Sequence, residues 1–231
     1  MTLRRGRPLG RTTTPSAPRG HMGIPEGRMA RHRAQAAAAE ASAAGGGGAL
    51  VLVGDSITQG WQTEGHDELL RPHRTVNLGT SGDRTEQMIW RLQNGELPAG
   101  IRPRAFTLMA GTNNAGLMRD EPAHIADGIF AIIDLLLAAD ATAPILLYPI
   151  FPRGRGATCE MRRITDGANR SLLARLPKSP RIIVRDIRQQ FLNSRGETIK
   201  NLMPDYLHLS RAGYEIWAKD LQGALATAQP R

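Results

Sequence analysis

The sequence predicts an α/β protein built on a doubly wound parallel sheet with helices on both faces. Short apolar runs recur along the chain, and segments with helical periodicity lie between them. None of these runs alternates cleanly between apolar and polar residues, which is typical of strands covered on both faces. Strands that alternate with helices indicate a parallel sheet. The 231 residues, 41% of them hydrophobic, suit one domain of about 200 residues plus a short extension.

The expected elements follow each other in regular alternation. The expected strands are residues 49–53, 75–78, 105–110, 144–150 and 181–187. The expected helices are residues 29–44, 83–93, 121–140, 159–176 and 210–225. Asp83 and Glu86 have the spacing of a capping box at the start of the second helix. Trp90 and Trp217 are expected in the core. The apolar stripes of residues 121–140 and 210–225 are expected to face the sheet.

The N-terminal part of the chain differs from the rest in composition. Residues 1–23 are rich in Arg, Gly, Pro, Ser and Thr and are predicted to be a disordered basic extension, followed by a folded domain over residues 24–228. Residues 1–48 carry eight arginines and two glutamates, so +6 of the formal net charge of +9 lies there. The basic segment is compatible with a disordered leader, a translated upstream region, a transit peptide or an arm that binds nucleic acid. No nucleic-acid partner is expected for the nearly balanced folded part.

Several classes of protein are disfavoured by composition. A single cysteine, Cys159, cannot form an internal disulfide or a cysteine-based metal site, and it is interpreted as a packing residue. The N-terminus lacks the apolar region of a secretory signal, and the apolar runs look shorter than the roughly 18–20 residues of a membrane span. We therefore expect a cytoplasmic protein without a transmembrane segment, with a transit peptide as the alternative.

Polar residues gather directly after the expected strands. Residues 54–58 read GDSIT, residues 79–83 read GTSGD, residues 111–114 read GTNN and residues 151–154 read FPRG. In doubly wound sheets, sites form beyond the carboxyl ends of the strands. Ser56 is a candidate nucleophile, and the glycines and amides of the next two segments are candidate hydrogen-bond donors. A nucleophile beside such donors is what acyl transfer needs.

A serine nucleophile needs a base, and His208 is the best placed of the six histidines. It lies in MPDYLHLS, residues 203–210, just before the last expected helix, and Asp205 precedes it by three residues. An aspartate can hold an imidazole in the tautomer whose other nitrogen accepts the proton of the serine. One short loop therefore supplies both partners.

These segments together resemble the SGNH (GDSL) hydrolase superfamily, over roughly residues 29–225. GDSIT, NLGTSGD, GTNN and DYLH stand for its four sequence blocks in order. The chain is similar in particular to the platelet-activating-factor acetylhydrolase subunit branch and its bacterial esterase relatives. That similarity lies in GDRTEQMIWRLQNGEL (82–97), FPRG (151–154), MPDYLHLSRAGYEIWA (203–218) and MARHRAQ. The serine does not lie in a Gly-x-Ser-x-Gly elbow, which disfavours the α/β-hydrolase architecture.

The resemblance implies a three-layer α/β/α sandwich with a central five-stranded, flavodoxin-like parallel sheet. It implies ester cleavage without a cofactor or metal, and a homodimer. Ser56 would be the nucleophile, His208 the general base and Asp205 the residue that orients His208. The oxyanion hole would consist of the Ser56 N–H, the Gly82 N–H and the side-chain amide of Asn113.

The chain departs from the branch at two positions. Ser81 stands where the branch often has glycine, and Asn114 follows Asn113 where the superfamily more commonly has aspartate. The close branch also has Asn-Asn, so we interpret Asn114 as a feature of the subtype with a structural role. Asp55 is expected to fix the Ser56 loop through hydrogen bonds.

Four functions are compatible with these residues. The first is an esterase that removes a short acyl group, such as acetyl, from a sugar or a small lipid-like alcohol. The second is a lysophospholipase or thioesterase that accepts longer chains. The third is a binding protein on the same fold, which the intact set of Ser56, Asp205 and His208 disfavours. The fourth is nucleic-acid binding through residues 1–33. Arg84 and Arg153 are expected near the mouth of the site, with a structural or solvated role favoured over contact with an anionic substrate.

Overall fold

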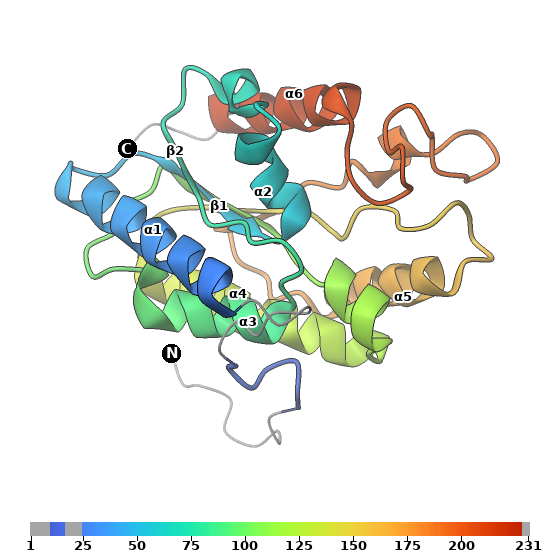
Figure 1. Cartoon of the computed structure of the whole chain (residues 1–231), viewed down its shortest axis with the longest axis horizontal. Coiled ribbons are helices and arrows are strands. Elements are labelled where there is room, and N and C mark those ends of the chain that lie inside the picture. Colours follow the sequence, from blue (N-terminus) through green and yellow to red (C-terminus); the bar gives the residue numbers. More distant parts are fainter. Residues whose placement is uncertain (1–9, 17–24, 228–231) are drawn as a thin grey trace.

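The computed structural model describes residues 10–16 and 25–227, and its centre is the expected parallel sheet (Figure 1). Five parallel strands lie in the order β2-β1-β3-β4-β5. They are β1 (Leu50–Gly54), β2 (Thr75–Asn77), β3 (Ala105–Met109), β4 (Ile145–Leu147) and β5 (Ile182–Val184). One row of the register runs from Asn77 through Leu52, Thr107 and Leu146 to Ile183. The predicted fold class is confirmed.

Helices cover both faces of the sheet, which makes the three layers. One face carries α1, α3, α4 and α5, and the other carries α2 and α6 (Figure 1). The helices are α1 (Pro25–Ala44), α2 (Ser56–Thr63), α3 (Thr85–Arg91), α4 (Pro122–Ala139), α5 (Glu160–Arg175) and α6 (Arg211–Thr227). Short 3₁₀ or π segments are η1 (Asp67–Leu70), η2 (Leu92–Glu96), η3 (Asn114–Met118) and η4 (Arg188–Phe191). The short helix α2, which begins at Ser56, was not among the expected elements.

The two layers of the core differ in how many aromatic side chains they contain. The layer beneath α4 is mainly aliphatic and includes Ile125, Ile129 and Ile133, all buried. The layer beneath α6 contains most of the buried aromatic residues, and the ring of Trp217 lies 5.1 Å from that of Trp61. The prediction that Trp217 lies in the core is therefore confirmed. Trp90 is only partly buried, because its ring faces His32 of α1 at 5.1 Å instead of the sheet.

Part of the N-terminal extension is ordered, contrary to the prediction of disorder. Residues 10–16 lie against α3 and α4, and Thr12 is 2% exposed. Its hydroxyl donates to the carbonyl of His124, and its own carbonyl accepts from the Thr85 hydroxyl. Arg11 pairs with Glu86. These specific hydrogen bonds offset the segment's lack of apolar side chains. The rest of the predicted extension, residues 1–9 and 17–23, lies outside the described residues.

One helix meets a membrane criterion that the sequence was not expected to meet. By length and composition alone α4 could cross a bilayer, with 18 residues and a mean hydropathy of 1.6. Core helices pass the same test, and the apolar stripe of α4 packs onto the sheet in this fold.

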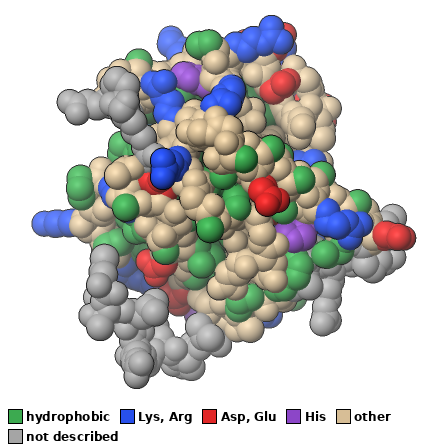
Figure 2. All heavy atoms as spheres, turned by 90° about the vertical axis from the view of Figure 1, so that its left-hand side faces the viewer, with side chains coloured by type: hydrophobic (Ala, Val, Ile, Leu, Met, Phe, Trp, Pro, Cys, Tyr) green, Lys and Arg blue, Asp and Glu red, His purple; other side chains and the backbone are tan. Residues whose placement is uncertain are grey.

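On the face of the molecule that carries α1, Lys and Arg side chains are scattered among neutral and apolar ones (Figure 2).

Candidate active site

The end of β1 presents Ser56 at the first residue of α2. Asp55 is the N-cap of that helix, and its Oδ1 accepts a hydrogen bond from the N–H of Ile57 at 3.0 Å. This hydrogen bond is the kind of contact expected of Asp55 beside Ser56. Gly54 is required here, because a Cβ at this position would lie 2.0 Å from the Thr58 hydroxyl and 2.8 Å from the Met109 carbonyl. The turn from strand to helix is therefore tight.

The loop before α6 brings His208 to Ser56 across 152 residues of sequence. Ser56 Oγ lies 3.0 Å from His208 Nε2, and His208 Nδ1 lies 2.7 Å from Asp205 Oδ2. The backbone N–H groups of Leu207 and His208 donate to Asp205 Oδ1 at 3.0 and 2.7 Å. Tyr206 adopts a left-handed conformation with φ of 60°, at a cost of about 1 kcal/mol. The structure thus aligns the three predicted residues in one hydrogen-bonded chain.

The charge of this chain follows from its surroundings. Partial burial of Asp205 raises its pKa, but hydrogen bonds from the ring and backbone of His208 together lower it more, so the net pKa lies below its usual range. An ionised Asp205 favours the tautomer of His208 with a proton on Nδ1. Nε2 is then free to accept the proton of Ser56. This is the arrangement that activates a serine hydroxyl.

The segment after β2 presents the candidate oxyanion donors beside Ser56. Gly82 has φ of +75°, a conformation that favours glycine. Within the described residues, neither its N–H nor that of Ser56 has a hydrogen-bond acceptor. Asn113, 6% exposed, donates from Nδ2 to the backbone carbonyl of Asp83 at 2.9 Å, which leaves its second N–H available. Unpaired donors next to a nucleophile can bind a developing oxyanion.

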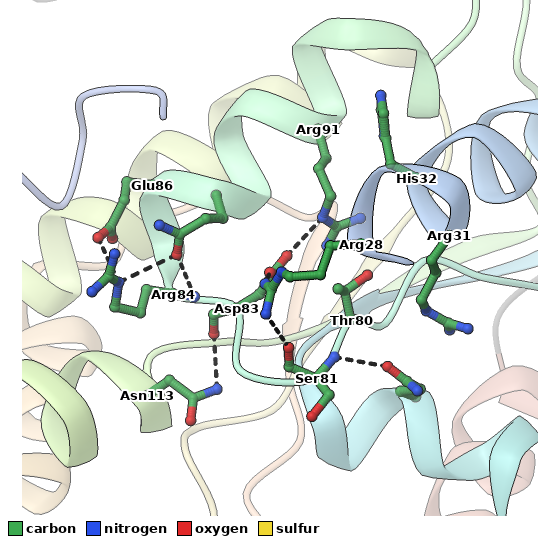
Figure 3. A network of polar contacts seen from close by, with 12 residues as sticks. Arg28, Arg31, His32, Thr80, Ser81, Asp83, Arg84, Glu86, Arg91 and Asn113 are labelled. Carbon is green, nitrogen blue, oxygen red and sulfur yellow. Dashed lines mark hydrogen bonds and ion pairs between the residues drawn. The ribbon is translucent and has the colours of Figure 1, made fainter. Parts of the chain in front are cut away.

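Helix α1 holds this donor segment, residues 79–83, from behind (Figure 3). Arg28 Nη1 donates to the Ser81 carbonyl at 2.7 Å, and Arg31 donates to the Gly79 carbonyl from Nε and Nη2 at 2.9 and 2.6 Å. From the other face of the sheet, Gln59 of α2 accepts from the Ser81 N–H at 2.7 Å. The segment is therefore clamped between α1 and the helix that carries Ser56.

A buried chain of charges extends from the donor segment through α3. The Asp83 carboxylate pairs with Arg28 and, at 2.6 Å, with Arg91 Nε. Arg91 also pairs with Glu96, and Glu96 lies 2.8 Å from His32 Nδ1. Burial lowers the pKa of Arg91, but Asp83 and Glu96 raise it more, so the guanidinium stays charged. Every member of this chain has an oppositely charged or hydrogen-bonding partner, as buried charges require.

The predicted capping box is wrong, because the Asp83 carboxylate pairs with two arginines and does not cap α3. The N-cap of α3 is Arg84, and its backbone N–H donates to the Gln87 side chain at 3.0 Å. The guanidinium of Arg84 pairs with Glu86 at 2.7 Å, which fits the structural role expected of Arg84.

Two further residues singled out from the sequence also have structural contacts. Asn114 accepts from the Thr85 N–H at 3.0 Å and donates to Asp120 at 3.0 Å. Arg153 donates to the carbonyl and hydroxyl oxygens of Thr112 at 3.1 Å. Among the residues that the structure describes, no group of three or more His, Cys, Asp and Glu is arranged to hold a metal ion.

The contribution of α1 to the site was missed in the sequence, although a signal was present. Arg28, Arg31, His32 and Gln35 follow each other at the spacing of one helical face. A helix that packs on a sheet normally turns an apolar face toward the core. The face formed by these four residues is polar instead. A polar stripe in that position indicates that the helix packs against polar groups. In the structure these groups are the backbone carbonyls of Asn77, Gly79 and Ser81 and the Asp83 and Glu96 carboxylates.

Comparison with known proteins agrees with this geometry. Residues 52–216 match the model of the GDSL-like lipase/acylhydrolase family. The chain is 36% identical over 177 residues to human platelet-activating factor acetylhydrolase IB subunit alpha1, which covers 76% of this chain and 74% of the relative.

Two solved structures share the fold at lower sequence identity. A GDSL-like lipase from Bacteroides thetaiotaomicron has a TM-score of 0.67 at 20% identity, over 86% of this chain and 97% of that one. The acetyl xylan esterase AlAXEase has a TM-score of 0.57 at 16% identity, over 76% and 98%. The match of the family model and of the human relative over most of the sequence shows that the chain belongs to the GDSL-like lipase/acylhydrolase family.

Proposed function

We propose that the protein is a serine esterase that hydrolyses short-chain, acetyl-type esters of a carbohydrate or a small lipid-like alcohol. The observation that carries this proposal is the hydrogen-bonded chain from Ser56 through His208 to Asp205 at the carboxyl edge of the sheet. The short acyl group is supported by the human relative, whose name describes an acetylhydrolase.

In the proposed mechanism, Ser56 Oγ attacks the ester carbonyl while His208 Nε2 takes its proton. Negative charge then develops on the carbonyl oxygen, where the N–H groups of Ser56 and Gly82 and the Asn113 amide stabilise it. His208 returns the proton to the leaving alcohol, which leaves an acyl-enzyme on Ser56. Water then attacks the acyl-enzyme by the same steps and releases the acid. Asp205 stays ionised throughout and stabilises the imidazolium.

A second candidate is a lysophospholipase or thioesterase that accepts longer acyl chains. It is favoured by Leu117 and Met118, which are 37% and 44% exposed and are the exposed large hydrophobic residues of the described chain. They lie at the end of η3, three and four residues after Asn114. An apolar chain that leaves the site on this side would cover them.

One experiment tests both candidates. Hydrolysis of the acetate, butyrate, octanoate and palmitate esters of p-nitrophenol is measured for the wild type and for Ser56→Ala. We expect turnover of the acetate that falls with chain length and is lost in Ser56→Ala. A preference for octanoate or palmitate would favour the second candidate. Equal rates for the two proteins would contradict the catalytic assignment. The homodimer and the cytoplasmic location remain predictions, and sedimentation equilibrium tests the first.

A further inference from the structure

The Ser81–Gly82 peptide connects α1 to the candidate oxyanion hole. The C=O and N–H of a trans peptide point in opposite directions. The C=O of this peptide points at α1, where it accepts from Arg28 Nη1 at 2.7 Å (Figure 3). The N–H of Gly82 must therefore point away from α1, toward the side of the segment on which Gln59 of α2 and Asn113 lie. One guanidinium thus determines which way the candidate donor faces.

The guanidinium of Arg28 is itself fixed by the segment that it holds. Its Nη2 pairs with the Asp83 carboxylate, two residues beyond the carbonyl that Nη1 contacts. The Arg28 side chain is 18% exposed and that of Asp83 is fully buried. Arg91 holds the second oxygen of the same carboxylate at 2.6 Å. Arg28 has little freedom to leave the Ser81 carbonyl.

The peptide that Arg28 holds is one that could rotate. Gly82 has no Cβ, and glycine populates positive and negative φ about equally, so little steric resistance opposes a flip of the preceding peptide. A flipped peptide would present the Ser81 carbonyl oxygen, instead of the Gly82 N–H, to the oxygen that becomes negative during acyl transfer. The replacement of a donor by an acceptor would abolish its contribution to the oxyanion hole.

We propose that Arg28 is a positioning residue, which holds the Ser81–Gly82 peptide with its N–H turned toward the substrate oxygen. This inference rests on the proposed function, since it gives Gly82 the role of an oxyanion donor. Arg28 acts in a second way through the same contact. A hydrogen bond to the C=O of a peptide polarises its N–H, because linked hydrogen bonds strengthen one another. The cation therefore also makes the Gly82 N–H a stronger donor.

The test compares three arginines of α1. Arg28→Met removes the contact with the Ser81 carbonyl and also one of the two guanidinium partners of the Asp83 carboxylate. Arg31→Met removes a similar contact with the carbonyl of Gly79, which belongs to a different peptide of the same segment. Arg33→Met changes an exposed arginine of the same helix. Both of the first two variants should lose stability through weaker anchoring of α1, and Arg28→Met should lose more because Asp83 also loses a cation. Loss of the oxyanion donor should be confined to Arg28→Met.

We expect Arg28→Met to lower kcat on p-nitrophenyl acetate by about 10- to 100-fold, somewhat less than the ~10²–10³ of an outright donor loss, with KM little changed. Arg31→Met should lower the melting temperature and should lower kcat clearly less than Arg28→Met does, whereas the exposed control Arg33→Met should match the wild type. Arg28→Lys should recover part of kcat, because a single ammonium group can still reach the carbonyl. Equal falls in kcat for Arg28→Met and Arg31→Met would overturn the proposal.

A second measurement does not depend on activity. The backbone ¹⁵N and ¹H resonances of Gly82 should shift in Arg28→Met and stay close to the wild type in Arg31→Met, because only the first change removes the hydrogen bond to that peptide. Unchanged Gly82 resonances in Arg28→Met would overturn the inference even if kcat fell. If the resonances shift as expected but the wild type shows no turnover that depends on Ser56, the proposed function fails and the structural role of Arg28 stands alone.

Discussion

The two halves of the candidate site are built in opposite ways. The half that would move protons is local and open: Asp205 and His208 lie on one loop, and their side chains are 55% and 46% exposed. The half that would hold the oxyanion is distributed and closed. Its donors depend on Asp83, Arg91 and Glu96, whose side chains are fully buried. These residues lie on the segment after β2, on α3 and on η2.

The difference follows from what each half must do. A general base must meet the substrate and exchange protons with water, so partial exposure is useful to His208. Oxyanion donors work because they are already oriented before charge develops, which requires rigid support in a water-poor environment. Substitutions in the open half should therefore change the rate and spare the fold. Substitutions behind the closed half should first change stability.

The largest effect is expected for His208→Ala, which tests the open half. Without a base to activate Ser56, kcat should fall on the order of 10⁴- to 10⁶-fold. The melting temperature should stay near that of the wild type, because nearly half of the side chain is exposed. Hydrolysis of p-nitrophenyl acetate and thermal unfolding measure the two quantities. A residual rate within 10-fold of the wild type would remove His208 from the mechanism.

Arg91→Met should have the largest effect on stability and tests the closed half. It leaves the buried carboxylates of Asp83 and Glu96 without their shared cation. Breaking a buried pair in this way costs about 3–5 kcal/mol in the free energy of unfolding. Urea denaturation measures this loss. The control is Arg211→Met, which removes an exposed ion pair with Glu68 and should leave the unfolding curve nearly unchanged. Equal midpoints for the two variants would contradict the contrast between the halves.

The open half could be predicted from the sequence because its signals are local. Asp205 and His208 are three residues apart, and Ser56 follows a strand whose apolar run is plain in the sequence. The order of strands and helices could also be predicted from the sequence, because strands and helices differ in the periodicity of their apolar residues. The prediction of disorder was wrong for residues 10–16, because it was based on the average composition of the segment. Composition does not reveal the hydrogen bonds that Thr12 makes with α3 and α4.

The support of the closed half could not be predicted because it depends on packing. Arg28 and Asp83 are 55 residues apart and meet only when α1 lies against the segment after β2. Asp83 and Glu86 have the spacing of a capping box, and this local pattern indicated that Asp83 caps α3. In the structure, however, the guanidinium groups of the partly buried Arg28 and the buried Arg91 bind the two oxygens of the Asp83 carboxylate. Such charge-assisted bonds are roughly twice as strong as the neutral bond of a helix cap.

Two adjacent amides sharpen the comparison further. Asn113→Ala should lower kcat by ~10²–10³, because it removes an oxyanion donor. Asn114→Ala should instead lower stability, because its side chain bonds to Thr85 and Asp120 and donates to no candidate oxyanion position. The ratio of the two kcat values on p-nitrophenyl acetate, read together with the two melting temperatures, measures the distinction. Similar kcat values would show that Asn113 supports the loop only.

Asp55 lies between the two halves, and Asp55→Asn should have the smallest effect. Burial raises the pKa of its carboxyl to about 7, while the hydrogen bond from Ile57 and the charge of His208 oppose that rise. The folded state therefore holds a proton that the unfolded state has lost, and the carboxyl costs stability as the pH rises from about 4 to about 7. An asparagine can cap α2 equally well and carries no charge.

The variant should therefore gain stability relative to the wild type as the pH rises. From the pKa near 7, the gain between pH 5 and pH 8 is roughly 2–3 kcal/mol, at 1.36 kcal/mol per pKa unit. Urea denaturation at several pH values measures the difference in the free energy of unfolding between the two proteins. A difference that does not change with pH would mean that Asp55 is ionised at all these pH values. Burial would then not raise the pKa of Asp55. Asp55 would belong with the open half of the site, and the buried charges behind Gly82 alone would make up the closed half.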